Sequence, residues 1–323
     1  MRIRIATRKS ALALTQTRWF ARQLEALPRV SSVELVEMVT LGDRVQGVPL
    51  TEVGGKGLFV TELEQALLEG RADIAVHSLK DMPAKLADGL ILGCVPERED
   101  PRDVLVTTDG ASLDDLEAGS RVGTSSLRRT LQLKRQRNDL EYALLRGNVD
   151  TRLSKLESGQ YRAIVLAYAG LRRLGLADRP LVPLPVTLSV PSVGQGALAI
   201  ECRESDAPLR ALLVKLEHAQ TRACVDAERV FLAALGGDCH TPLGGHATFE
   251  AESQRLRFEG LVASPDGKQM IRSASERYVP AGDALREHAL TLGRETADRL
   301  LAQGAAAILS ESVKGRDPRI KPS

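Results

Sequence analysis

Apolar residues along the first hundred positions alternate between the spacing of strands and the spacing of helices. Ser10 precedes a stretch in which Phe20, Leu24 and Leu27 fall on one helix face, so it is expected to cap that helix. The pattern predicts strands at residues 2–6, 33–39 and 73–77, helices at residues 10–27 and 58–68, and a glycine-rich connection at residues 42–57. Alternating strands and helices predict a mostly parallel sheet with helices on its faces.

A charged segment bounded by Pro96 and Pro101 interrupts this pattern and marks a domain boundary. The alternation then restarts. Strands are expected near residues 104–106, 121–123, 142–145 and 164–167, with helices near residues 126–137, 149–157 and 170–174. Residues 180–191 contain four prolines and indicate a return segment, and residues 197–202 have the pattern of a strand that can rejoin the first sheet.

The last third of the chain has a different pattern. A helix is expected at residues 221–235, followed by a tight glycine-rich loop at residues 236–245. Antiparallel strands are predicted at residues 247–250, 257–262 and 270–275, before an amphipathic helix at residues 283–301. These elements predict a small α+β unit, and the basic residues from position 315 onward indicate a disordered tail.

Composition narrows the classes of function. The 323 residues carry a net charge of only +2, and aromatic residues make up 3% of the chain, which argues against a nucleic-acid-binding surface. No leader segment and no membrane span are recognised, so a cytoplasmic location is expected. The four cysteines show no C-x-x-C spacing, so neither a disulfide framework nor a metal site is predicted.

Two arginine-rich stretches give the clearest chemical signal. Residues 123–129 read Gly-Thr-Ser-Ser-Leu-Arg-Arg, and residues 145–152 read Leu-Arg-Gly-Asn-Val-Asp-Thr-Arg. A guanidinium matches a carboxylate or phosphate with two parallel hydrogen bonds, and small residues at a helix start leave N–H groups available to the same anion. We predict that both stretches bind a small polyanion, with a solvated basic helix face as the alternative. The arginines concerned are Arg128, Arg129, Arg146 and Arg152.

The segment His-Ser-Leu-Lys-Asp-Met-Pro at residues 77–83 follows the predicted strand at residues 73–77. Ligands of open α/β sheets gather at the carboxyl ends of strands, so these side chains are placed to meet one. Asp81 is a candidate general acid/base, or a carboxylate that balances positive charge on a substrate. A surface ion pair with Lys80, or a turn position, explains it equally well.

A second glycine-rich segment, Gly-Gly-Lys-Gly-Leu-Phe at residues 54–59, lacks the spacing of a nucleotide-binding loop. We interpret it as a hinged loop that carries Lys56 over a binding site, with a flexible connector as the alternative. Arg8 and Ser10 repeat the combination of arginine and hydroxyl at the start of a helix.

Cys239 differs from the other three cysteines. Cys94 and Cys202 lie in apolar strand patterns and Cys224 lies in a helical pattern, so all three are expected to pack as small apolar side chains. Cys239 lies in the glycine-rich loop beside His240, where a thiol can be exposed and ionised.

Several segments of the chain match one family in order. They are residues 6–10, 53–59, 75–81 and 97–103, the two arginine-rich stretches, residues 169–173 and 193–197, and the loop around Cys239. Over nearly its whole length the chain thereby resembles the porphobilinogen deaminases, or hydroxymethylbilane synthases. The resemblance implies a transferase of tetrapyrrole and haem biosynthesis. Such an enzyme joins four porphobilinogen molecules head to tail, with release of ammonia, into hydroxymethylbilane.

By this resemblance Cys239 carries the family's cofactor, a dipyrromethane primer, through a thioether. Asp81 would be the catalytic carboxylate, facing pyrrole nitrogens and offsetting positive charge on an azafulvene-like intermediate. The acetate and propionate groups of each pyrrole would account for the many cations. The resemblance implies that the cofactor is bound by Thr124, Ser126, Lys80, Arg128, Arg129 and Arg146, and the substrate by Arg8, Ser10, Lys56, Arg152, Arg173 and Gln195.

The architecture that the resemblance implies is two doubly wound α/β domains, like those of periplasmic binding proteins, and a smaller α+β domain with the cofactor cysteine. The expected bounds are residues 1–98 with 197–216 for the first domain, 99–196 for the second, 217–314 for the third and 315–323 for a tail. Asp238 departs from the family's usual Gly-Gly-Cys. Its carboxylate is expected to disfavour the thiolate of Cys239.

Two other classes of function are compatible with the arginines. A non-catalytic, two-lobed anion-binding protein would leave Asp81 and Cys239 without a role. A nucleic-acid-binding protein conflicts with the near-neutral charge and the few aromatic residues. We therefore expect a monomeric enzyme whose partner is the small molecule porphobilinogen, with no nucleic acid and no membrane.

Overall fold

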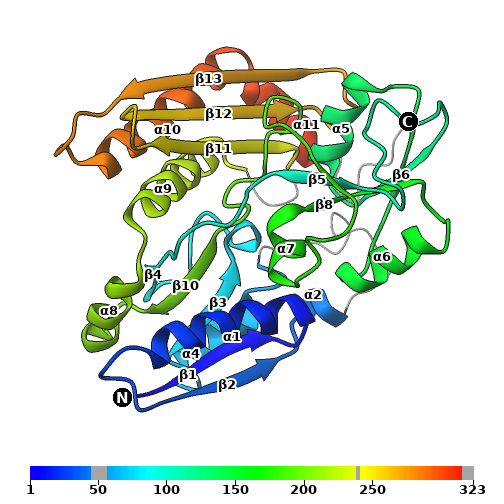
Figure 1. Cartoon of the computed structure of the whole chain (residues 1–323). Helices are drawn as coiled ribbons and strands as arrows, with labels where there is room; N and C mark the ends of the chain where they lie inside the picture. Colours follow the sequence, from blue (N-terminus) through cyan, green and yellow to red (C-terminus); the bar gives the residue numbers. More distant parts are fainter. Residues whose placement is uncertain (45–56, 238–240, 315–323) are drawn as a thin grey trace.

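The computed structural model describes residues 1–44, 57–237 and 241–314. Three sheets, each with its own helices, divide these residues into three units (Figure 1). Two units are α/β domains with a five-stranded, mostly parallel sheet, and the third is a smaller α+β domain with a three-stranded antiparallel sheet. The expected fold class is confirmed.

The sheet of the first domain has the strand order β2-β1-β3-β10-β4. Its strands are β1 (Arg2–Arg8), β2 (Ser32–Met38), β3 (Ile74–Ser78), β4 (Leu90–Cys94) and β10 (Leu198–Arg203). β1 pairs in parallel with β2 and β3, whereas β10 runs antiparallel to β3 and β4. The helical segments are α1 (Ala11–Glu25), α2 (Leu41–Arg44), α4 (Thr61–Leu68), α8 (Ala207–Leu213) and η2 (Val214–Leu216).

The sheet of the second domain has the order β7-β6-β8-β5-β9. Its strands are β5 (Asp103–Val106), β6 (Arg121–Thr124), β7 (Glu141–Leu144), β8 (Ala163–Ala167) and β9 (Leu181–Pro183). Its helices are α5 (Leu127–Gln136), α6 (Val149–Glu157) and α7 (Tyr168–Arg173). Ser126 caps α5 and Asn148 caps α6, each by accepting a hydrogen bond from a backbone N–H of the first turn.

The two α/β sheets share one plan. In each, the fourth strand of the order runs antiparallel to its neighbours, namely β10 in the first sheet and β5 in the second. β5 is the first strand after the chain passes into the second domain, and β10 is the first strand after it returns. Two crossing segments, residues 95–102 and 184–197, therefore connect the two domains.

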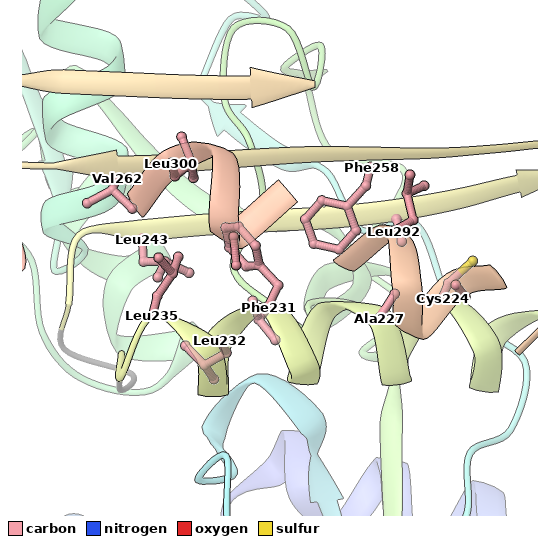
Figure 2. Packing of buried hydrophobic residues seen from close by; sticks show 14 of the residues in the cluster. Cys224, Ala227, Phe231, Leu232, Leu235, Leu243, Phe258, Val262, Leu292 and Leu300 are labelled. Atoms are coloured by element: carbon pink, nitrogen blue, oxygen red, sulfur yellow. The ribbon is translucent and has the colours of Figure 1, made fainter. Parts of the chain in front are cut away.

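The third domain packs its helices on one face of its sheet (Figure 1). The elements are α9 (Ala219–Ala234), β11 (Leu243–Glu250), β12 (Arg255–Ala263), β13 (Met270–Tyr278), α10 (Leu285–Ala302) and α11 (Ala305–Lys314). Figure 2 shows the core between them, where Phe231 of α9 lies against Phe258 of β12 with ring centroids 4.9 Å apart. Leu292 and Leu300 of α10 belong to the same core.

The structure contains short elements that the pattern of the sequence did not predict. They include α2, β4, β9, α8, η2 and α11. β9 lies inside the proline-rich return segment, where a strand of three residues at the edge of the sheet tolerates Pro183. Lys56, Asp238, Cys239 and the predicted tail lie outside the described residues. Within the described ranges, no helix is long and apolar enough to cross a membrane.

Glu228 joins the three domains. This fully buried carboxylate of α9 accepts hydrogen bonds from Arg98 Nη1 at 2.6 Å, from the N–H of Gly194 at 2.6 Å and from the N–H of Ala247 at 2.9 Å. Arg98 and Gly194 belong to the two crossing segments. Burial alone would raise the pKa of Glu228, but the guanidinium of Arg98 and the ring of His246 lower it to about 2.

We expect Glu228→Gln to lower the free energy of unfolding by about 3–5 kcal/mol, because it leaves Arg98 buried without its counter-charge. The folded-state pKa lies below the ordinary 4.5, so this stability is fully present above pH 4.5 and is lost as the pH falls toward 2. Chemical denaturation between pH 7 and pH 2 measures both effects. Glu276→Gln, at an exposed ion pair, is the matched control; an equal loss in the control contradicts the prediction.

Candidate active site

The segment after β3 carries Lys80 and Asp81 in a short 3-10 helix, η1 (Leu79–Asp81). Leu79 is buried, and its N–H donates to Ala197 O at 3.0 Å. Gly194, with φ at +72°, packs so closely that a Cβ there would lie 2.0 Å from Leu79 Cδ2, and only glycine fits. Asp81 is therefore held at the carboxyl end of β3, with its side chain half-buried.

The side chains of Lys80 and Asp81 form no hydrogen bond and no ion pair with another described residue. The pKa of Lys80 is lowered to about 8, mainly by burial and also by the nearby charge of Arg129, against the opposing charge of Asp81. The negative charge of Asp103 also raises the pKa of Lys80. Because Arg129 and Asp103 belong to the second domain, Lys80 and Asp81 lie where the two α/β domains face each other.

Arg128 and Arg129 are both paired with one internal carboxylate, that of Asp103 at the start of β5. Arg128 donates from Nη1 to Oδ2 at 2.8 Å and from Nη2 to Oδ1 at 3.2 Å, and Arg129 donates from Nε to Oδ1 at 2.8 Å. Burial would raise the pKa of Asp103, but the two guanidinium groups hold it well below its usual range. All three side chains are buried. Neither arginine is therefore a free guanidinium.

Gln195 belongs to the same buried network. Its Nε2 donates to Asp103 Oδ1 at 2.9 Å and to Pro101 O at 2.7 Å. Ser189 donates to the other carboxylate oxygen at 2.7 Å. Gln195 and Ser189 lie in the return crossing and Pro101 in the outgoing one, so the network fastens both crossing segments to the base of α5.

Arg146 and Arg152 are in a different state from that pair. Arg146 Nη1 is buried and has no hydrogen-bond partner, and Arg152 donates from Nε to the backbone carbonyl of Gly147 at 2.8 Å. Within the described part of the chain neither has a carboxylate partner. The pKa of Arg152 is lowered to about 10, mainly by burial and also by the charges of Arg129 and Arg146, against the opposing charge of Asp81. The guanidinium of Arg152 therefore feels the charge of Asp81 and has Arg146 as a second cation nearby.

Arg8 is paired with an acid of its own domain. Its Nη2 donates to Asp43 Oδ1 at 2.5 Å, and its guanidinium lies 4.2 Å from the ring centroid of Phe59. Arg173 donates from Nη2 to Gly196 O at 2.7 Å. Burial lowers the pKa of Arg173 to about 10, against the charge of Glu99.

The hydroxyl groups near these arginines bond to backbone N–H groups. Ser10 Oγ accepts from Ala13 N at 3.3 Å and Ser126 Oγ accepts from Arg129 N at 3.5 Å, so both are helix caps. Thr124 Oγ1 accepts from Ser126 N at 3.2 Å.

The three described cysteines are buried, as expected. Burial raises the pKa of Cys94 and Cys224 to about 12 and that of Cys202 to about 11, which leaves their thiols protonated and unreactive. The predicted roles of Lys56 and Cys239 fall on residues outside the described ranges, and both stay predictions.

Sequence reasoning missed Asp103 as the partner of the arginine pair. The available signal was a lone carboxylate at the first position of an otherwise apolar strand, where an acid is buried only if it is paired. Sequence reasoning also missed Ser189 and Arg98, because their partners, Asp103 and Glu228, lie 86 and 130 residues away in the chain.

Comparison with known proteins identifies the family. The family model described as "Porphobilinogen deaminase, dipyromethane cofactor binding domain" matches residues 3–211, and that described as "Porphobilinogen deaminase, C-terminal domain" matches residues 222–302. A porphobilinogen deaminase of Brevibacillus brevis is 49% identical over 311 residues, which cover 96% of this chain and 97% of that protein.

Some solved structures of binding proteins are more distantly similar. The ligand-binding component of an ABC-type import system from Staphylococcus aureus is 10% identical with a TM-score of 0.38, covering 72% of this chain and 73% of that one. An ABC transporter periplasmic binding protein from Brucella ovis is 13% identical with a TM-score of 0.39, covering 72% and 68%. The two family models and the near full-length relative are decisive, and the chain belongs to the porphobilinogen deaminase family.

Proposed function

We propose that Asp81 is the catalytic carboxylate in the head-to-tail condensation of four porphobilinogen molecules, and that Lys80, Arg146 and Arg152 bind the carboxylates of the growing chain. Family membership makes the protein a transferase of tetrapyrrole biosynthesis with a dipyrromethane cofactor, rather than a non-catalytic anion-binding protein. One observation carries the role of Asp81. It is a carboxylate without a hydrogen-bond partner among the described residues, and its charge acts on Lys80 and Arg152, which have no ion partner among those residues.

The described residues fit a dipyrromethane. Each of its rings bears carboxylates, and Arg146 presents a buried Nη1 that lacks an acceptor. An unsatisfied buried donor costs about 1–3 kcal/mol, so a bound carboxylate would remove that cost. Arg152 and Lys80 add two half-buried positive charges. When bound, the dipyrromethane supplies the covalently held rings to which the first substrate unit is joined.

Asp81 would act on charge that develops in the substrate. As ammonia leaves porphobilinogen, the pyrrole becomes electron-poor, and a carboxylate already in place stabilises that charge without reorganising. The same oxygen atoms can accept a hydrogen bond from a pyrrole N–H. Because Asp81 has no partner among the described residues, it breaks no described hydrogen bond to do either.

The arginine pair would contribute differently from the unpaired arginines. Arg128 and Arg129 share the single charge of Asp103, so the three side chains together carry one net positive charge beside Lys80. With Gln195, Thr124 and Ser126 they would set the position of α5 and the field at the site.

The remaining positions extend the substrate site in this proposal. Arg8 would exchange Asp43 for a substrate carboxylate, and Arg173 would meet the chain as it lengthens. Ser10, Lys56 and Gln195 stay predicted substrate contacts, and Thr124, Ser126, Arg128 and Arg129 stay predicted cofactor contacts. A cytoplasmic monomer that acts on porphobilinogen, with no nucleic acid or membrane partner, also stays a prediction.

Asp81→Asn keeps the size of the side chain and removes its charge. We expect turnover to fall about 100-fold or more, because such electrostatic stabilisation is lost, while the protein remains folded and retains its primer. Steady-state kinetics with porphobilinogen and intact mass measure this. Asp88→Asn, at an exposed ion pair with Lys85, is the control. Near-normal turnover by Asp81→Asn would rule out the assignment.

Asp103→Asn and Arg152→Gln should separate the paired arginines from the binding ones. Asp103→Asn leaves two buried guanidinium groups unpaired and is expected to lower the free energy of unfolding by about 3–5 kcal/mol. Arg152→Gln removes a half-buried cation that has no ion partner among the described residues, so it should weaken porphobilinogen binding without lowering stability. Denaturation and KM measurements test both, and the proposal is wrong if Arg152→Gln destabilises the protein as much as Asp103→Asn.

Cys239→Ser should abolish the covalent primer. The purified protein is expected to exceed its sequence mass by two pyrrole units, to react with Ehrlich's reagent, and to keep the adduct under reducing agents because a thioether is not a disulfide. Cys239→Ser should lack the adduct and most activity, whereas Cys224→Ser should keep both. Peptide mapping of the adduct to Cys94, Cys202 or Cys224 contradicts the prediction.

A further inference from the structure

Arg229 of α9 connects the third domain to the chain that follows Asp81. Its Nη1 donates to Pro83 O at 3.2 Å and its Nη2 donates to Ala84 O at 2.9 Å. These carbonyl groups lie in the irregular stretch between η1 and β4, where no helix or strand supplies them with donors. Arg229 is half-buried and has no ion pair within the described ranges. Its guanidinium is therefore hydrogen-bonded to the backbone carbonyl groups two and three residues after Asp81.

The neighbouring residue of the same helix holds the chain on the other side of Asp81. Glu228 accepts the N–H of Gly194 at 2.6 Å, and Gly194 packs directly against Leu79, the first residue of η1. Two consecutive residues of α9 thus fix the backbone before and after the carboxylate.

The position of Asp81 depends on its backbone, because its side chain has no hydrogen bond among the described residues to hold it. Catalytic groups need to stay within about 0.5 Å of the productive geometry, and a displacement of about 1 Å can cost about 100-fold in rate. A guanidinium is suited to this task, since its planar fork can meet two successive carbonyl oxygens in a fixed geometry. The ammonium group of a lysine is a single point on a flexible stem.

We infer that Arg229 is a positioning residue for Asp81: it fastens the segment at Pro83 and Ala84 to α9 and so keeps the carboxylate aligned between the two α/β domains. The inference rests on the proposed catalytic role of Asp81. Arg229 acts through the backbone and touches no reacting atom.

Four holoenzyme variants test the inference: Arg229→Gln, Arg229→Lys, Asp81→Asn and the double variant Arg229→Gln/Asp81→Asn. Arg222→Gln is the matched control, because Arg222 lies on the same helix and also donates to a first-domain carbonyl, that of Leu92, but does not contact the Asp81 segment. Each variant is measured for kcat and KM with porphobilinogen, for primer mass and for melting temperature.

We expect Arg229→Gln to lower kcat about 10- to 100-fold with KM within about twofold of the parent and the primer present. Arg229→Lys should recover part of kcat. Arg222→Gln should lower the melting temperature while kcat stays within about twofold. In the double variant the loss should equal that of Asp81→Asn alone, because Arg229 acts only through that carboxylate.

A kcat within about twofold of the parent in Arg229→Gln, or losses that multiply in the double variant, overturns the inference while leaving the role of Asp81 standing. Full turnover by Asp81→Asn overturns the proposed function and the inference with it. If Arg229→Gln does not fold, Arg229→Lys decides by the same criterion: reduced kcat at unchanged KM supports positioning, and parental kcat overturns it.

Discussion

The architecture depends on one buried carboxylate. Glu228 accepts hydrogen bonds from Arg98 in the outgoing crossing, from Gly194 in the return crossing and from Ala247 in the third domain. Gly194 in turn lies against Leu79, at the start of the turn that carries Asp81. The relative placement of the domains and the position of the turn with Asp81 thus depend on one electrostatic centre. Its carboxylate tolerates complete burial because it is paired with the guanidinium of Arg98.

Cations of one residue type serve two purposes in this protein. Where an arginine faces an internal acid, as Arg128 and Arg129 face Asp103, it belongs to the framework and fixes the base of α5. Where no described acid is available, as for Arg146 and Arg152, the cost of burial is left for a bound anion to offset. The proposed function assigns these unpaired cations to the carboxylates of the cofactor and the substrate.

Much of the secondary structure could be predicted from the sequence, because a helix is easily recognised where hydrophobic periodicity follows a capping residue. Ser10 and Ser126 were predicted as helix starts and are caps in the structure, and the strand near residue 200 rejoins the first sheet. Short elements such as β9 carry too few residues to show a period. The pairing of Arg128 in α5 with Asp103 was also missed, since this acid lies 25 residues away in the chain, at the start of β5. The sequence shows which side chains are charged, but the tertiary fold determines which of them form ion pairs.

The place of β10 has a consequence for the order in which the protein becomes structured during synthesis. β10 lies between β3 and β4, so β4 has no neighbour in the sheet until residues 198–203 have been made. The amino-terminal domain is therefore the first to be synthesised but not the first able to complete its sheet. The second domain, whose strands span residues 103–183 without interruption, can fold earlier on the ribosome. Until the chain returns, the unfinished first sheet exposes an open strand edge, the kind of surface that favours aggregation.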